Sequence, residues 1–393
     1  EYRNVLLPEV ARLYQADIEE YNNAISMEDS KPEKKNYSLL NWLDKVRQTY
    51  QQEQILVFYS RYNLIPKYGF PVDTVTLFTD FMTQGYKNNN SKLMLQRDLI
   101  QAISEYAPES EVVADGMMYT SQYVKKPLKI DTTWKQYLVS LCDDPACNKV
   151  VIEPYTGQTI NGKTVCSSCG SQSVLPQIMI IPEFGFIIKP LVVEVTTKRP
   201  TKTPRTEFYY LGVFNDERAK TAKQYSFGSV RLSVISSPDD RLLVMNKSEF
   251  LVCQTCGYAE MSHGRPYAKV QHSNPRVYAC NDTALIKRSL GHTFRTDVAL
   301  ITVNWIMSQD EAITILYALL EGCSRYFDIE RDDIDGCLSY QSYAAEGGNT
   351  GTTFVLFDSV PGGAGNVKRL YDSNRDLFMN FLQCALDRVR NCD

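Results

Sequence analysis

The pattern of apolar and polar positions changes character along the chain. Residues 10–25 and 39–59 place apolar side chains at steps of three and four among Glu, Gln, Lys and Arg, which predicts two helices. The stretch 64–78 differs, because its prolines and glycine oppose a helix and the Val/Thr alternation that follows favours a strand. We therefore place a boundary near residue 64.

The middle of the chain is predicted to be rich in β-strands. Residues 110–300 contain runs such as KVVIEP, QIMIIPEFGFII and SVRLSVI, separated by turn-forming Asn-Gly, Pro-Asp and glycine-containing stretches. Helical periodicity returns at 308–323, which begins with a Ser or Asp N-cap, and at 367–390, with a short buried strand at 352–357 between them. The expected fold class is α+β, with a helical segment at 1–63, a β-rich region at 64–245 and a C-terminal α/β domain at 246–393.

Composition and charge are those of an ordinary folded protein. The chain is 44% hydrophobic, 22% charged and 11% aromatic, which excludes collagen-like, disordered and low-complexity classes. A net charge of -4 means that any contact with nucleic acid or an anionic membrane must come from a local patch. The most apolar stretch is interrupted by prolines and charges, and the first residues lack a secretory signal. We expect a cytoplasmic location, no membrane partner and, since the chain begins without Met, a piece of a longer protein.

Four cysteines have the spacing of a zinc ribbon. Cys142 and Cys147 are separated by four residues, and Cys166 and Cys169 follow after 18 more. Eleven cysteines without a secretory signal fit metal ligands in a reducing compartment better than disulfides. Two such pairs can close a four-thiolate site around Zn²⁺. The spacing therefore predicts a zinc ribbon at residues 142–169.

The segment between these pairs also matches the phosphate-loop pattern G-x-x-x-x-G-K-[ST], through Gly157, Gly162, Lys163 and Thr164. A working phosphate loop opens a helix whose first amides bind the phosphates. Here a cysteine pair follows at once, and Asn161 before Gly162 favours a hairpin turn. We interpret the match as a coincidence.

A second set of metal-ligand residues begins with Cys253 and Cys256. Cys280 supplies a third thiolate, and His272 is the better fourth ligand because it lies in a polar, turn-forming stretch close to Cys280. His263 is the reserve candidate. Four protein ligands at each site are typical of structural rather than catalytic zinc. The sequence thus predicts two structural Zn²⁺ ions.

A glycine-rich segment near the C-terminus leaves two interpretations open. Residues 355–365 run from a strand through a glycine-rich turn into the last helix, which carries Lys368 and Arg369 in its first turns. This geometry can bind an anion; equally, Asp358 and the glycines can form a tight turn without a ligand. The remaining basic candidates for nucleic-acid contact, which often form only a solvated face, are Lys198, Arg199, Lys202 and Arg205, with Lys125, Lys126 and Lys129.

Several sequence blocks stand out between residues 60 and 393, namely LIPKYGFPVD, RDLIQAISEYAPESEVVADGMMY, CQTCGYA, LGHTFRTDVALI, YALLEG and FDSVPGGAG. Together they resemble the MrfA-type zinc-binding (MZB) region at the C-terminal end of large bacterial DEAD/DEAH-box helicases. Such helicases serve in DNA repair and in antiphage systems such as DISARM and Druantia. By this resemblance, the family's CxxCG…H…C positions correspond to Cys253, Cys256, His272 and Cys280, and a further cysteine cluster would begin near Cys392.

The resemblance implies an accessory, non-catalytic module of a superfamily 2 ATP-dependent DNA helicase. Such a module would position single- or double-stranded DNA or a partner subunit, while the motor lobes lie elsewhere in the parent chain or in a partner, because no DEAD/DEAH box is present in this sequence. One alternative is a protein-interaction scaffold without nucleic-acid binding. Another is a metal-dependent nuclease or hydrolase using Asp297, Asp358 and His292, although no H-E-x-x-H or G-x-S-x-G motif supports it.

Overall fold

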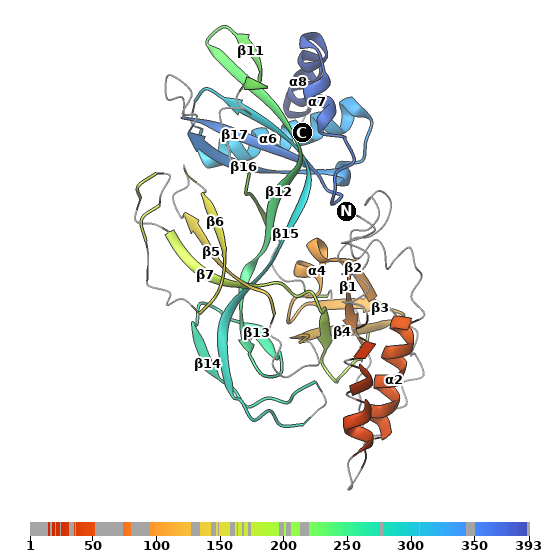
Figure 1. Cartoon of the computed structure of the whole chain (residues 1–393). Coiled ribbons are helices and arrows are strands. Elements are labelled where there is room, and N and C mark those ends of the chain that lie inside the picture. The colour runs from red at the N-terminus through yellow and green to blue at the C-terminus, as the bar shows by residue number, and fades with distance from the viewer. Residues whose placement is uncertain are drawn as a thin grey trace. The chain divides into compact units, whose positions relative to one another are not determined.

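The structure is a computed structural model of the whole chain (Figure 1). It describes residues 15, 18–19, 21–23, 25–30, 35, 37–51, 74–79, 95–126, 134–142, 147, 149–157, 162, 164–166, 169–171, 174–195, 200–201, 206–212, 220–275, 278–305, 307–342 and 350–390. The predicted helix at 10–25 lies largely outside these residues.

The chain divides into two compact units, each assembled from three stretches. The first unit contains 1–135, 180–205 and 246–290, and the second contains 136–179, 206–245 and 291–393. Strands β12 (Val230–Cys253) and β15 (Ala284–Val303) each run from one unit into the other. The domain boundaries predicted at 63 and 245 stay predictions, because the first lies outside the described residues and the second lies within β12.

The first unit contains the smaller sheet. Its order is β2 (Leu95–Asp98), β1 (Thr74–Phe78), β8 (Phe186–Ile188), β4 (Met117–Val124) and β3 (Glu111–Ala114), and β9 (Val193–Glu194) also pairs with β4. β1 pairs with β8 in parallel, and the other pairs are antiparallel. The Val/Thr alternation in β1 buries Val75 and Leu77, as expected for a strand with one covered face. Helices α2 (Tyr37–Gln51) and α4 (Leu99–Glu105) belong to the same unit.

The larger sheet has the order β10 (Thr206–Tyr210), β12, β15, β7 (Val174–Ile180), β5 (Gln136–Cys142) and β6 (Val150–Pro154). β11 (Lys223–Phe227) pairs with β12, and β17 (Thr350–Asp358) pairs with both β15 and β16 (Ile334–Ser342).

One predicted turn is absent from this sheet. The Pro-Asp pair was expected to separate two strands, but β12 continues through it. Within this strand the exposed Asp239 adopts a left-handed backbone conformation with a φ of 51°. Asp tolerates this conformation better than most residues do.

Three α-helices lie wholly within the described part of the second unit. Helix α6 (Gln309–Phe327) begins at the predicted place, where Ser308 and Glu311 form a reciprocal capping box. The helix predicted at 367–390 is instead two helices, α7 (Lys368–Asp372) and α8 (Arg375–Arg390). The break occurs because Ser373 is extended and the Asn374 side chain accepts from the Leu377 N–H at the start of α8.

Helices α6 and α8 pack closely at a small-residue contact. A Cβ at Gly322 would lie 2.7 Å from the Cβ of Ala385. The two helices and β17 enclose a core that includes Leu320, Phe354, Phe378 and Phe381.

The protein is therefore a β-rich mixed α/β chain with two curled sheets and C-terminal helices. No helix in the described part of the chain combines the length and apolarity needed to cross a bilayer.

Candidate metal centres

The first cysteine set comes together in the second unit. Cys142 ends β5, and its N–H donates to the Lys149 carbonyl at 2.9 Å, which folds back the segment carrying Cys147. The Sγ atoms of Cys142 and Cys169 lie 3.6 Å apart, and those of Cys147 and Cys166 lie 3.7 Å apart. All four sulfur atoms are within 4.8 Å of one another, and only the Cys169 side chain is exposed. We call this set the four-cysteine cluster.

The second pair of this cluster is shaped by its backbone. The Gly170 N–H donates to the Cys166 carbonyl at 2.9 Å, and Gly170 adopts a φ of 73° that favours glycine. Thr164, the last residue of the phosphate-loop pattern, forms an antiparallel bridge with Val174 and opens no helix. Lys163 and Asn161 lie outside the described residues.

The second set, the histidine-containing cluster, comes together in the first unit. Cys253 ends β12, and a tight turn follows in which the Gly257 N–H donates to the Cys253 carbonyl at 3.0 Å. The Cys280 N–H donates to the His272 carbonyl at 2.9 Å. This hydrogen bond holds the other two candidate ligands, His272 and Cys280, side by side. The Sγ atoms of Cys253 and Cys280 are 4.0 Å apart, and Cys256 Sγ lies 3.2 Å from His272 Nε2.

Gly257 fixes this turn against strand β4. Its φ is 81°, and a Cβ at this position would lie 2.1 Å from the Val124 carbonyl oxygen. The Val124 N–H in turn donates to the Gly257 carbonyl at 2.9 Å. Only glycine satisfies both the backbone conformation and the close approach.

The His272 ring is oriented by two contacts. Its Nδ1 lies 2.9 Å from the Val270 carbonyl oxygen, so that Nδ1 carries the proton and Nε2 presents its lone pair toward Cys256. The Tyr258 ring stacks on the imidazole, with centroids 4.5 Å apart and planes inclined by 20°. His263, by contrast, lies on an exposed turn with a φ of 46° and takes no part in either cluster.

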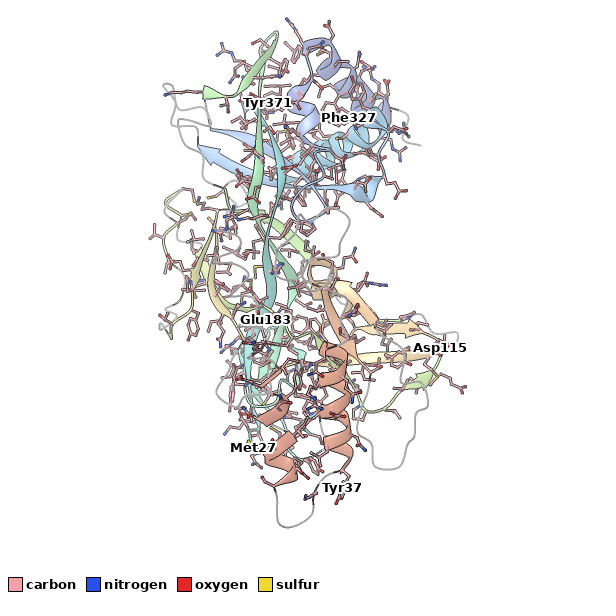
Figure 2. All side chains as sticks on the ribbon, turned by 45° about the vertical axis from the view of Figure 1, so that its right-hand side comes forward. Met27, Tyr37, Asp115, Glu183, Phe327 and Tyr371 are labelled. Atoms are coloured by element: carbon pink, nitrogen blue, oxygen red, sulfur yellow. The ribbon has the colours of Figure 1, made fainter. Side chains whose placement is uncertain are left out.

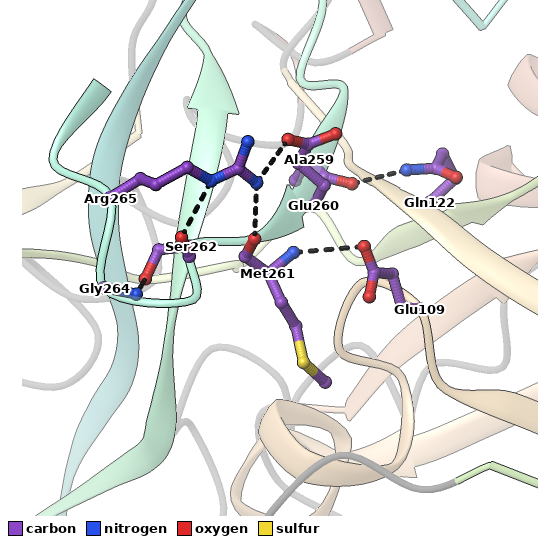
Figure 3. A network of polar contacts seen from close by, with 8 residues as sticks. All are labelled: Glu109, Gln122, Ala259, Glu260, Met261, Ser262, Gly264 and Arg265. Carbon is purple, nitrogen blue, oxygen red and sulfur yellow. Dashed lines mark hydrogen bonds and ion pairs between the residues drawn. The ribbon is translucent and has the colours of Figure 1, made fainter. Parts of the chain in front are cut away.

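Strand β13 (Ala259–Met261), which leaves this turn, is anchored by polar contacts (Figure 3). The Gln122 side-chain amide donates to the Ala259 carbonyl, and the Glu109 carboxylate accepts from the Met261 N–H at 3.1 Å. Arg265 donates to the Glu260 carboxylate at 3.0 Å. These contacts hold the segment that follows Cys256 in one position.

Both clusters have the dimensions of a tetrahedral zinc site. Zn–S bonds of about 2.3 Å place two sulfur ligands about 3.8 Å apart, and the paired sulfur atoms here are separated by 3.6 to 4.0 Å. A hydrogen bond with Cys256 lowers the pKa of the Cys253 thiol, and the same contact raises the pKa of Cys256. Each cluster offers four protein ligands, which is the closed arrangement of a structural metal.

The glycine-rich turn after β17 is closed by the protein's own carboxylate. Asp358 Oδ2 accepts from the N–H groups of Ala364 and Asn366 at 2.6 and 3.1 Å, and Oδ1 accepts from Val367 at 3.0 Å. Burial raises the pKa of the fully buried Asp358, while these three hydrogen bonds act in the opposite direction. Of the two interpretations left open above, the geometry favours the tight turn, because Asp358 takes the place of an external anion.

The basic residues considered for nucleic-acid contact lie in different surroundings. The Arg369 guanidinium donates to the Phe327 carbonyl at 3.1 Å and lies 4.2 Å from the centre of the Phe327 ring, which is labelled in Figure 2. Lys368 and Arg369 are both exposed. Lys125 Nζ lies 3.6 Å from the centre of the Phe78 ring, and Lys126 donates to the Gln254 carbonyl. Outside the described residues lie Lys129, Lys198, Arg199, Lys202 and Arg205.

The residues proposed for a nuclease or hydrolase form no metal-ligand cluster within the described chain. Both carboxylate oxygens of Asp358 are engaged by backbone N–H groups. Gly363 lies against Asp297, because a Cβ at Gly363 would approach the Asp297 carboxylate to 2.4 Å. These carboxylates therefore shape the turn.

Sequence comparison identifies the class of the C-terminal part. Residues 315–393 match the MrfA Zn-binding domain (MZB), which confirms the predicted resemblance. The chain is also 26% identical over 359 residues to the Druantia protein DruE of Escherichia coli (strain UMEA 4076-1). That match covers 80% of this chain and 19% of DruE, so the chain spans about a fifth of the length of this relative.

A solved structure was also found by comparison. The crystal structure of the DUF1998 helicase MrfA bound to DNA aligns with a TM-score of 0.35 and 10% sequence identity, covering 81% of this chain and 30% of that one. The region that matches the MZB family, 315–393, contains neither cysteine cluster. The two candidate metal centres therefore rest on their own geometry.

We predict that the Asp358 carboxylate is required for the stability of the glycine-rich turn. Asp358→Asn retains the shape but directs an NH₂ group at backbone donors, and an unsatisfied buried donor costs about 1–3 kcal/mol. Chemical denaturation should show a reduction in the free energy of unfolding of this size. Asp239→Asn, in an exposed ion pair with Arg295, is the control and should change stability by less than about 1 kcal/mol. An Asp358→Asn protein as stable as the wild type would contradict this assignment.

Proposed function

We propose that this chain is a zinc-binding accessory module of a DEAD/DEAH-box ATP-dependent DNA helicase, acting in antiphage defence or DNA repair. The observation that carries the proposal is the match of residues 315–393 to the MrfA Zn-binding domain, and the similarity to Druantia DruE supports it. In this proposal the motor lobes belong to the parent chain or to a partner subunit, and the module positions DNA or that partner.

The two clusters would each hold one structural zinc ion. The metal supplies four strong bonds where a loop-rich segment has few apolar contacts of its own. Cys142, Cys147, Cys166 and Cys169 would join the end of β5 to the segment preceding β7. Cys253, Cys256, His272 and Cys280 would join the end of β12 to the segment preceding β15.

Nucleic-acid contact in this proposal comes from the basic stretch 198–205. Pro200 and Pro204 favour an extended backbone, and four cations fall within eight positions of an otherwise acidic chain. The middle of the stretch is anchored, because the Thr201 N–H donates to the Glu111 carboxylate at 2.6 Å and the Glu111 N–H donates to the Thr201 carbonyl at 2.8 Å. Lys368 is the secondary candidate, since Arg369 is held by Phe327.

The zinc prediction is that purified protein contains two equivalents of the metal. Ligand thiolates bind metal only as the site folds, so Cys166→Ser and Cys256→Ser should each lose one equivalent and lower the melting temperature. Cys384→Ser, outside both clusters, should retain both equivalents. Elemental analysis and thiol titration provide the measurements. A zinc content near zero, with titratable free thiols and unchanged melting of the variants, would refute the proposal.

The DNA prediction concerns salt dependence. Replacing Lys198, Arg199, Lys202 and Arg205 by alanine should reduce the logarithmic salt slope of binding by about 0.7 to 0.9 for each phosphate that these side chains neutralise in the wild type. The control variant replaces four other cations by alanine, so that it loses the same number of positive charges and keeps the basic stretch intact. These cations lie in exposed or half-exposed ion pairs and are Lys35, Lys135, Lys287 and Arg388.

The measurement is a salt titration of binding to single- and double-stranded DNA. The control variant should keep the wild-type slope. Equal slopes for the wild type and the basic-stretch variant would remove this stretch from the DNA path. Absence of binding by the wild type at low salt would favour a protein-interaction scaffold.

A further inference from the structure

We propose that Tyr258 and Tyr123 are positioning residues that hold the His272 ring so that Nε2 points toward Cys253, Cys256 and Cys280. This inference rests on the proposed function, in which the histidine-containing cluster binds zinc. It assigns a role to two aromatic side chains that are not themselves ligands.

The ring of an imidazole ligand must be oriented more strictly toward the metal than a thiolate side chain must be. A sulfur atom binds metal over a broad range of directions, whereas the Nε2 lone pair lies in the plane of the ring. The hydrogen bond from Nδ1 to the Val270 carbonyl fixes one edge of His272. That bond lies at the edge of the ring and does not support its face, so a second contact, with the face, adds to the control of the ring plane.

Tyr258 supplies this second contact. Its ring is nearly parallel to the imidazole, with a centroid separation of 4.5 Å and an inclination of 20°. Because Tyr258 comes two residues after Cys256, the turn that carries one ligand also carries the surface that orients another. The main chain of Tyr258 accepts from the Cys253 N–H at 2.8 Å, a bond that survives replacement of the side chain.

Tyr123 in turn holds the Tyr258 ring in place. The buried Tyr123 ring, on strand β4, packs edge-on against Tyr258 with centroids 5.8 Å apart and planes at 77°. Its hydroxyl donates to the carbonyl of Ser273 at 3.1 Å, directly after His272 in the chain. Tyr258 thus covers one face of the His272 ring, while Tyr123 contacts Tyr258 and the backbone of the residue that follows His272.

The four-cysteine cluster of the same molecule provides an internal reference. Its four ligands are thiolates, and no imidazole has to be oriented there. A change that acts through ring orientation should therefore affect the histidine-containing cluster alone. A general loss of folding should affect both.

The experiment measures the cobalt affinity of each cluster in the full chain. Co²⁺ bound by three sulfurs and one nitrogen absorbs differently from Co²⁺ bound by four sulfurs, so competition with a chelator resolves the two sites. Tyr258→Leu should weaken the histidine-containing site by about 10- to 100-fold, the usual effect of removing a group that orients a ligand. Tyr258→Phe keeps the stacking ring and should stay close to the wild type, and Tyr123→Phe should weaken the site by about fivefold.

A second comparison separates orientation from general support of the fold. In a His272→Ala background there is no ring to orient, so adding Tyr258→Leu should cause no further loss of cobalt affinity. Equal weakening of both clusters, or the same loss with and without His272, would overturn the inference. So would a Tyr258→Leu protein of wild-type affinity, or a loss in Tyr258→Phe as large as in Tyr258→Leu. A wild-type protein without the three-sulfur, one-nitrogen spectrum would instead refute the zinc proposal for this cluster.

Discussion

The close approach of the Cys253–Gly257 turn to strand β4 is the constraint on which much of the first unit depends. Gly257 allows the turn to contact the Val124 carbonyl, and this contact brings Tyr123 to the side of Tyr258 and His272. The polar contacts of β13 then fix the outgoing chain. A candidate metal centre and a sheet strand distant in sequence are thereby parts of one packed arrangement.

The helical part of the second unit depends on different physics. The core formed by α6, α8 and the strands β15 to β17 consists of apolar side chains and includes no residue of either cysteine cluster. The buried Asp358 satisfies three backbone donors of the turn into α7, which would otherwise carry the cost of unpaired buried amides. The region that matches the MZB family thus owes its described structure to ordinary packing, capping and one buried carboxylate.

The proposed role as a helicase accessory module agrees with these observations. Closed four-ligand clusters provide stability and no open coordination position for catalysis. In this proposal, a chain of net negative charge contacts a phosphate backbone where cations are clustered, as they are in the sequence at 198–205. In the proposed role, the chain positions a substrate or a partner.

The two ligand sets, the strand at 74–78 and the start of α6 were predictable from the amino-acid sequence, because ligand spacing, residue alternation and capping are encoded within a few neighbouring residues. Features that depend on residues distant in the sequence were not predictable in this way. Local propensity did not reveal that β12 continues through Asp239, and it could not choose between an external anion and Asp358 as the group that closes the glycine-rich turn. The contact between Tyr123 and Tyr258 gave no sequence signal either, since only the folding of β4 against the Gly257 turn brings these two rings together.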